Sequence, residues 1–570
     1  MSKQHAGIKI RVSKAHVATG WILAVAICIW PAFTARAEQA SRTVADLDKT
    51  GASFAKAGSA NDTAKADSHM TPEQAKQLFS LVDELIKFSS DETGLPIKSS
   101  VKRKLTTRSE VEKYLTEKMN DDQDAKRMQQ DEIVLKKFGL LDRDFNLKPF
   151  LVALLKEQIE AYYDSKTKTV NMLDWVSIDE QKPVLAHELT HALQDQHSDL
   201  EKWNDQTPED VSTNPAQDQD HLAKDEMDTA RDAIAEGQAT AVMMDYVLKP
   251  LGKSLVKDPE VMNLLKDQMA GDDSPVMARA PKLLSESMLF PYREGLSFEQ
   301  DIWMDQGQKA AFAGALDKPP TSSWEIMNPR EYEKRSLPPV PLMPNIHPLV
   351  DAAYKPYDIG QIGQLDLHIL AEIFSGDKAA ADLTPAWNGG IYWAGQLRGA
   401  KSAAEQSSTK SLAFFYLSAW KNARAAEAFA RMYADSLGRK YSGVKLDAAA
   451  AGTAHADNGD TETIYSTSEG PVAITTRGNL VFVAESFPLE LARKLGTLLL
   501  DAQGSGEMRM AGLSGPSSLA GRLLPVNGAA VEPLSTSPLS ASPISASFVR
   551  FFENSGVMKV AVDATTAAGR

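Results

Sequence analysis

The 570-residue chain contains a single cysteine, Cys28, within an N-terminal stretch that has the features of a cleavable export signal. Once that stretch is removed, the mature protein has no thiol, which excludes disulfide bonds, cysteine metal ligands and a cysteine nucleophile. A membrane-spanning run is missing as well. The apolar run from Trp21 to Trp30 is about half as long as a spanning helix must be, so we expect no stable membrane span after signal removal.

Residues 1–37 have the parts of a secretory signal peptide. Four basic residues precede the apolar run: Lys3, Lys9, Arg11 and Lys14. Ala35-Arg36-Ala37 follows it as an A-x-A cleavage pattern. A lipoprotein signal is disfavoured because Ile27 precedes Cys28, where a small residue is expected. We therefore expect an exported protein, either periplasmic or extracellular.

The chain has fewer basic than acidic residues: 62 Lys and Arg against 76 Asp and Glu, which gives a net charge of −14 at pH 7. The signal holds five basic residues and no acidic one, so its loss would take the net charge to −19. A surface this acidic disfavours nucleic acid and anionic lipid as partners. The hydrophobic content of 43% is enough to fill the cores of several domains.

The N-terminal part changes from linker to helix at about residue 70. Residues 38–70 are rich in Ala, Ser, Asp and Lys, which predicts a disordered linker. Thr71-Pro72-Glu73-Gln74 then supplies a cap, a first-turn proline and a capping-box glutamine for a first helix. A second capping box from Ser109 to Glu112 predicts another helix, and Gly139 is expected to end a third.

The next segment predicts a hairpin followed by two long helices. Strands are expected around Ile159 to Tyr163 and Thr169 to Leu173, joined by a polar turn. A helix follows, for which Pro183 suits the first turn. Residues 201–219 are polar and predict a loop, and a long helix is expected from about Asp220 to Leu248. From 319 to 348 the chain is proline-rich and predicts an extended strap.

Beyond His347 the pattern becomes mixed. Helices are expected at Ile362–Phe374, Asn422–Leu437 and Leu489–Asp501, and strands at Ile391–Trp393, Leu412–Leu417, Val472–Thr475 and Leu480–Ala484. The chain therefore predicts an α+β protein: a mainly helical domain with a small edge sheet over 71–345, and a C-terminal α+β accessory domain over 346–570. A Ser/Pro/Gly-rich loop is expected at about 504–547.

Residues 187–197 read HELTHALQDQH and begin with an H-E-x-x-H motif. On a helix, residues four apart share one face, so His187 and His191 can bind one metal ion. Glu188 can act as general base on a metal-bound water. The motif therefore predicts a zinc (Zn²⁺) cofactor and hydrolytic chemistry. The alternative is a helix with two histidines and no metal.

A catalytic zinc needs a third protein ligand, and the sequence offers two main candidates. His197 has the spacing of the metzincin signature, but Gln194 stands where that signature has a chain-turning glycine. Six residues of continuous helix rotate by about 600°, which would point His197 about 120° away from the pair. Glu236, 45 residues after His191, is the gluzincin-type candidate and is favoured. Asp228, Asp232 or no third ligand remain open.

Small residues on the helix around Glu236 support Glu236 as the third ligand. They are Ala233, Gly237 and Ala241, and they would allow the backbone of this helix to approach the motif helix closely. A second helix could in this way bring a glutamate to the histidine pair.

Five segments together carry a resemblance: EAYYDSKTKTVNML, LAHELTHALQDQH, ARDAIAEGQATAVM, FPYREGLSFEQDIW and PPTSSWEIMNPREY. They resemble a poorly characterised family of secreted bacterial and archaeal zincin-like proteins over roughly residues 150–345, with a weaker echo around 387–392. The resemblance implies a zincin fold and proteolysis, and carries over His187, Glu188, His191 and Glu236 by position. At this position the family typically has the aspartate of E-G-D-A, whereas this chain has Gln238. A contact that such an aspartate would make to a metal-ligating histidine is therefore in question.

These observations lead us to expect a secreted zinc metallopeptidase that acts on a protein or peptide substrate with Glu188 as general base. Two alternatives stay open: a catalytically silent zincin-fold binding protein, and a hydrolase of cell-wall peptides. Tyr292 and Arg293 are candidates for stabilising an oxyanion, but a Phe-Pro-Tyr corner is equally typical of structural packing.

Overall fold

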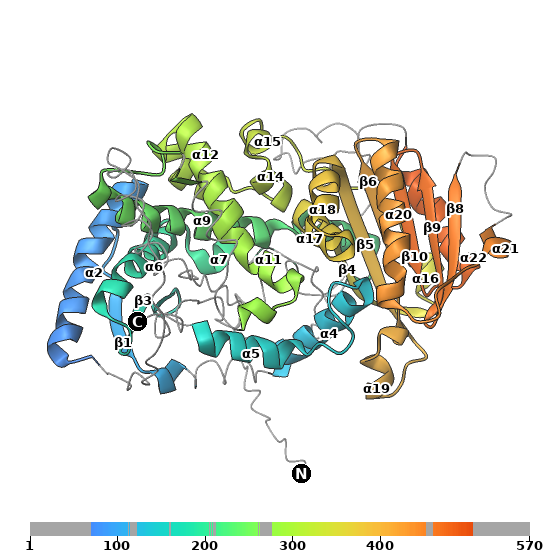
Figure 1. Ribbon diagram of the computed structural model, residues 1–570, viewed down its shortest axis with the longest axis horizontal. Coiled ribbons are helices and arrows are strands. Elements are labelled where there is room, and N and C mark those ends of the chain that lie inside the picture. Colours follow the sequence, from blue (N-terminus) through green and yellow to red (C-terminus); the bar gives the residue numbers. More distant parts are fainter. Residues whose placement is uncertain are drawn as a thin grey trace, which may run out of the picture.

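The computed structural model describes residues 70–504, apart from gaps at 112, 114–121, 159–160, 205, 207, 209–211, 260, 263–275 and 452–459. The predicted signal peptide, the predicted linker up to residue 69 and the Ser/Pro/Gly-rich segment beyond residue 504 lie outside the described residues. Figure 1 shows a mainly helical part with a small sheet, and a second part built around a larger sheet. The chain therefore has a mixed α+β architecture.

Three long helices form the centre of the helical part: α2 (Pro72–Thr93), α6 (Ile178–Ser198) and α9 (Met227–Leu248). Helix α6 packs against both α2 and α9. The other described helices and turns here are α4 (Asp122–Phe138), α5 (Leu147–Gln158), α7 (Leu200–Asn204), α8 (Pro215–Lys224), η1 (Lys249–Leu251), η2 (Met277–Arg279), α11 (Lys282–Phe290), η3 (Pro291–Gly295), α12 (Leu296–Gln306), η4 (Ala310–Gly314), α13 (Ala315–Asp317), α14 (Ser323–Met327) and α15 (Pro329–Glu333). Of these, η3 and η4 are π-helical turns.

The small sheet has three strands in the order β1-β3-β2. β1 (Lys102–Thr106) runs parallel to the central strand β3 (Thr169–Leu173). β2 (Ala161–Asp164) pairs antiparallel with β3 and forms an edge of this sheet. Helix α6 contacts β2, so an edge strand lies beside the helix that carries the H-E-x-x-H motif.

The larger sheet is antiparallel throughout. In spatial order its strands are β4 (Tyr354–Gln361), β5 (Trp387–Leu397), β6 (Leu412–Trp420), β10 (Leu480–Glu485), β9 (Gly470–Arg477), β8 (Thr461–Thr467) and β7 (Lys445–Leu446). The helices and turns of this part are α16 (His347–Val350), α17 (Gln364–Ser375), α18 (Asp377–Leu383), η5 (Thr384–Ala386), α19 (Ala403–Gln406), η6 (Thr409–Ser411), α20 (Ala423–Lys440), α21 (Ala448–Ala451) and α22 (Leu489–Ala502).

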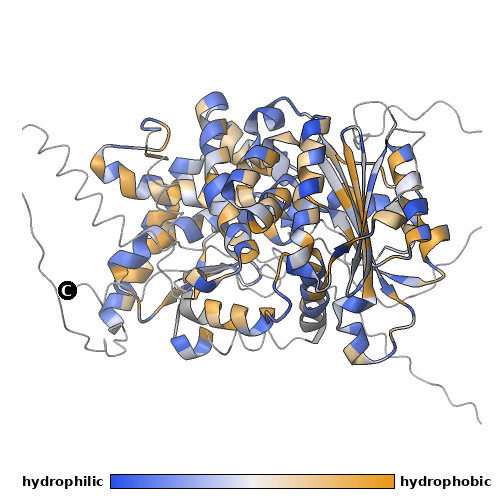
Figure 2. Cartoon of the chain, turned by 45° about the vertical axis from the view of Figure 1, so that its right-hand side comes forward, coloured by the Kyte–Doolittle hydropathy of each residue, from blue (hydrophilic) through white to orange (hydrophobic). Residues whose placement is uncertain are grey.

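Both faces of the larger sheet are covered by helices. Alternate side chains of a strand point to opposite faces, so Phe414 and Tyr416 of β6 enter one core and Phe415 the other. Helix α20 covers the first face through Phe429, and α22 covers the second through Leu495. The strands are accordingly hydrophobic along much of their length, whereas the helices have mixed faces (Figure 2).

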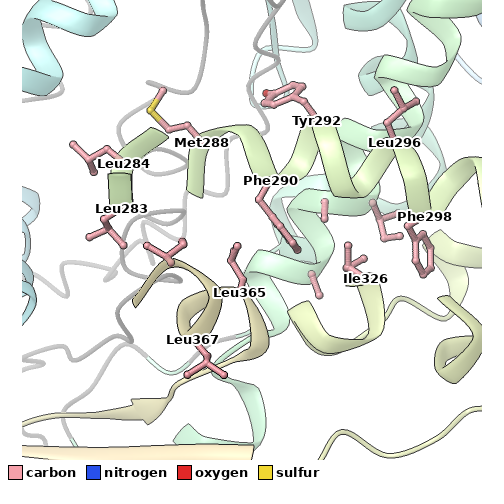
Figure 3. Close-up of a cluster of buried hydrophobic side chains, with 14 of the residues drawn as sticks. Leu283, Leu284, Met288, Phe290, Tyr292, Leu296, Phe298, Ile326, Leu365 and Leu367 are labelled. Atoms are coloured by element: carbon pink, nitrogen blue, oxygen red, sulfur yellow. The ribbon is translucent and has the colours of Figure 1, made fainter. Parts of the chain in front are cut away.

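One continuous core joins the two parts. Phe138 at the end of α4 packs on the larger sheet, with ring centroids 4.4 Å from Phe414 and 5.2 Å from Tyr392. Figure 3 shows a second junction, where Leu365 of α17 lies near Phe290 of α11. The domain boundary predicted at residues 345/346 stays a prediction. Helix α4, which precedes this boundary in the sequence, covers part of the larger sheet, whose strands follow the boundary.

Several predicted elements are confirmed. Thr71 caps α2 in a capping box with Gln74, and Gly139 follows α4 with a φ of 84°. The hairpin corresponds to β2 and β3, with residues 159–160 outside the described residues. The elements expected beyond His347 correspond to α17, β5, β6, α20, β9, β10 and α22.

Two predicted helix starts are wrong. The cap after β1 is Thr107 with Glu110, because Thr107-x-x-Glu110 offers the same capping pattern two residues before Ser109. Pro183 lies inside α6, not in its first turn, since Ser177 and Glu180 form a capping box that begins the helix at Ile178.

The segments predicted as a loop over 201–219 and as one helix from Asp220 to Leu248 are also corrected. Helix α8 already begins at Pro215 under an Asn214 cap, and it ends at Lys224 before α9 begins. Asp225 and Glu226 lie between the two helices, and their buried carboxylates accept hydrogen bonds from Gln361 N and from Ser323. The proline-rich strap contains the short helices α14 and α15, with Pro329 at a first-turn position, where its missing N–H costs no hydrogen bond.

None of the helices in the described part of the chain combines the length and apolar character that a membrane-spanning helix needs.

Candidate metal centre

Helix α6 holds the H-E-x-x-H motif in its buried middle. The helix runs unbroken from its Ser177 cap to Ser198. His187 and His191 lie one turn apart on one face, with ring centroids 4.7 Å apart and ring planes at 81°. Their Nε2 atoms are 3.0 Å apart, and both side chains are fully buried. The local helix geometry alone therefore brings two potential ligand atoms together.

Helix α9 brings Glu236 to this pair. Its Oε2 atom lies 3.1 Å from His187 Nε2 and 3.5 Å from His191 Nε2. Among the described residues, these three form the one group of His, Cys, Asp or Glu side chains whose potential ligand atoms all lie within 4.8 Å of one another. Glu236 is fully buried, which would be costly for an isolated carboxylate with no cation or hydrogen-bond donor beside it.

The spacing of the three ligand atoms fits a four-coordinate metal ion. With ligand distances of about 2.0–2.1 Å, two atoms at a tetrahedral angle are separated by about 3.3 Å. The observed separations of 3.0, 3.1 and 3.5 Å bracket that value. Three protein ligands also leave one position for a water or a substrate atom.

The other candidate ligands lie elsewhere. His197 Nε2 donates a hydrogen bond of 2.9 Å to Asp317 Oδ1, and the His197 side chain is 20% exposed. This placement follows from the continuous helix, because Gln194 provides no turn toward the pair. Asp228 accepts a hydrogen bond from Gln206 N and is not part of the three-residue group. Asp232 is also outside it; burial and the nearby Glu236 carboxylate raise the pKa of Asp232 well above its ordinary value.

The side chain of Glu188 extends from the motif helix α6 toward the edge strand β2. Its Oε2 accepts a hydrogen bond of 2.7 Å from the backbone N–H of Tyr163 in β2. Further along α6, the Tyr163 hydroxyl donates to Asp195 at 2.7 Å, and Lys168 forms an ion pair with Asp195 at 2.7 Å. These contacts fix the hairpin against α6, and they place the motif glutamate beside the strand edge.

Two glutamines behind His191 are functional candidates that the sequence pattern does not reveal. Gln194 stands where the metzincin signature has a glycine, and its Oε1 lies 2.8 Å from His191 Nδ1. Gln238 stands where the resembled family has an aspartate, and its Oε1 accepts from Gln194 Nε2 at 2.9 Å. The signal that could have found Gln194 is its i+3 position from His191 on the same helix.

The small residues of α9 serve a different contact from the one predicted. A Cβ atom added to Gly237 would lie well within 3.0 Å of the backbone of Gly295 in η3. In turn, a Cβ on Gly295 would collide with the carbonyl oxygen of Ala233. Ala233 and Gly237 of α9 therefore pack on η3, while α9 also packs against α6.

Of the two oxyanion candidates, Tyr292 lies beside a motif histidine. Its fully buried ring is nearly parallel to that of His187, with centroids 6.5 Å apart and planes at 22°. Arg293 is engaged in an ion pair with Glu286 at 2.6 Å. The π-helical turn η3 thus places the Tyr292 ring beside the His187 imidazole.

Comparison of the chain with protein-family models, with curated proteins and with solved structures finds no match. The functional assignment therefore depends on the site itself.

Proposed function

We propose that this protein is an exported, zinc-dependent metallopeptidase with a zincin fold of the gluzincin type. The observation that carries the proposal is the position of the Glu236 carboxylate, 3.1 and 3.5 Å from the two motif imidazoles. Two neutral imidazoles and one carboxylate are the donor set of many hydrolytic zinc sites with an open fourth position. Export is proposed from the signal-like first 37 residues.

The chain's own residues have clear roles in this proposal. His187, His191 and Glu236 would hold the metal. Bound zinc would polarise a water molecule and lower its pKa toward neutrality. Glu188 would accept the proton of the attacking water and pass it to the leaving amine. The Tyr163 N–H holds the Glu188 carboxylate beside β2, where an extended peptide could pair with the strand edge.

Glu188 also favours catalysis over a silent binding role. It is not part of the three-residue ligand group, so metal binding alone would not require it. The Glu188 carboxylate is buried on the helix that carries His187 and His191, and its hydrogen bond from Tyr163 N–H orients it.

The test is hydrolysis by the purified mature protein, offered casein and, separately, cell-wall muropeptides. Cleavage that a chelator abolishes and added zinc restores would support the proposal, with the Glu188→Gln protein as the inactive control. Cleavage of muropeptides alone would point to a cell-wall hydrolase. A zinc-loaded protein inactive on both substrates would favour the binding-protein alternative and contradict the proposal.

A further inference from the structure

A chain of side-chain amides connects His191 to two backbone carbonyls on another element. Gln238 Nε2 lies 3.0 Å from both the Ala311 and the Phe312 carbonyl oxygens in the π-helical turn η4. Carbonyl oxygens only accept hydrogen bonds, so the amide edge facing them must be the NH₂ group. The Oε1 atom of Gln238 therefore points the other way, toward Gln194.

The orientation of the Gln194 amide is fixed twice. Its Nε2 donates to Gln238 Oε1 at 2.9 Å and to the backbone carbonyl of Ala235 at 3.0 Å. Both partners are acceptors, so this edge of Gln194 must also be the NH₂ group. Gln194 is completely buried, which keeps both edges of its amide away from bulk solvent. Its Oε1 atom consequently faces His191.

The last link sets the protonation of the imidazole. Gln194 Oε1 lies 2.8 Å from His191 Nδ1 and can only accept, so Nδ1 must carry the hydrogen. A neutral imidazole has one N–H, which leaves the lone pair on Nε2. That Nε2 atom is the one directed at His187 Nε2 and Glu236 Oε2.

We propose that Gln194 and Gln238 are positioning residues that hold His191 in its Nδ1–H tautomer, with the Nε2 lone pair directed at the metal site. The inference rests on the metal centre of the proposed function and adds what orients one of its ligands. Partners of this kind behind a ligand histidine fix its ring and its tautomer, and their loss typically weakens metal binding. The side chain at position 238 must be an amide for these contacts, because a carboxylate could not donate to the Ala311 and Phe312 carbonyls.

Zinc affinity measured by chelator competition tests the proposal. Gln194→Met should bind zinc roughly 10- to 100-fold more weakly than the wild type. Gln238→Met should lose less, because the Ala235 carbonyl still orients Gln194. Since the two residues act in series, adding Gln238→Met to Gln194→Met should cost little more. The matched control is Gln181→Met, which removes another buried, hydrogen-bonded amide from α6 without touching the motif.

The tautomer itself can be read in the zinc-free protein by ¹⁵N NMR of labelled histidines, with His191→Ala supplying the assignment. We expect His191 to be protonated at Nδ1 in the wild type. An Nδ1 atom without a hydrogen, or a Gln194→Met protein that binds zinc as tightly as Gln181→Met, would overturn the inference. A wild-type protein that takes up no zinc would instead refute the metal centre, and the NMR result would still decide the tautomer.

Discussion

Gly237 of α9 lies directly against Gly295 of the π-helical turn η3, with no room for a side-chain carbon on either residue. We expect Gly237→Ala to destabilise the protein by about 1–3 kcal/mol or more, because the obstructing atoms are backbone and cannot rotate away. The measurement is the free energy of unfolding in denaturant. Gly438→Ala is the control: this helical glycine of α20 has open space around it, so alanine there should stabilise by about 0.5–1 kcal/mol. Equal effects at the two positions would contradict the proposed close contact.

Replacement of Glu188 should separate metal binding from hydrolysis. The Glu188→Gln protein is expected to keep zinc, because Glu188 is outside the group of three candidate ligands. It should lose nearly all peptidase activity, since an amide cannot take a proton from the attacking water. Zinc content and initial rates are measured on the same preparation. Retention of activity would show that Glu188 is not the base, and loss of zinc would show that it helps to hold the metal.

Glu226 should make stability depend on pH. Burial first, and then the nearby Asp366 carboxylate, raise the pKa of Glu226 to about 8 from 4.5. The folded state therefore keeps a proton that the unfolded chain has lost, and Glu226 reduces stability progressively as the pH rises from about 4.5 to about 8. In the Glu226→Gln variant the amide oxygen could still accept the hydrogen bonds from Ser323, and the side chain would carry no charge.

The stability advantage of Glu226→Gln over the wild type should consequently grow by on the order of 2–4 kcal/mol as the pH rises from 5 to 9. Denaturant unfolding at the two pH values measures this gain. The exposed Glu84→Gln on α2 serves as the control and should follow the wild type at both. A Glu226→Gln protein whose advantage does not grow with pH would disprove the assignment.

The sequence predicts those features that depend on local geometry. The histidine pair follows from i,i+4 spacing, and the exclusion of His197 follows from the rotation of an unbroken helix. Of the strands in the larger sheet, the sequence predicts only the hydrophobic ones. β4 was missed because it contains Pro356 and polar residues, which are tolerated since β4 forms an edge of the sheet, with a register shift between Pro356 and Asp358.

Features that depend on contacts between distant segments could not be predicted. The partner of Gly237 is 58 residues away in the chain, at Gly295, and no periodicity points to it. The hydrogen bond between Gln194 and Gln238 likewise joins residues 44 positions apart. The zincin fold, the identity of the metal and the peptidase activity stay predictions.

The most direct test of the central claim is the zinc content of the purified mature protein and of single-residue variants. We expect about one zinc per chain in the wild type. His187→Ala and His191→Ala should lose it, and Glu236→Gln should bind it far more weakly. His197→Ala should keep it, because His197 contacts Asp317 and not the site. A Glu236→Gln protein with full zinc alongside a zinc-free His197→Ala protein would contradict the account.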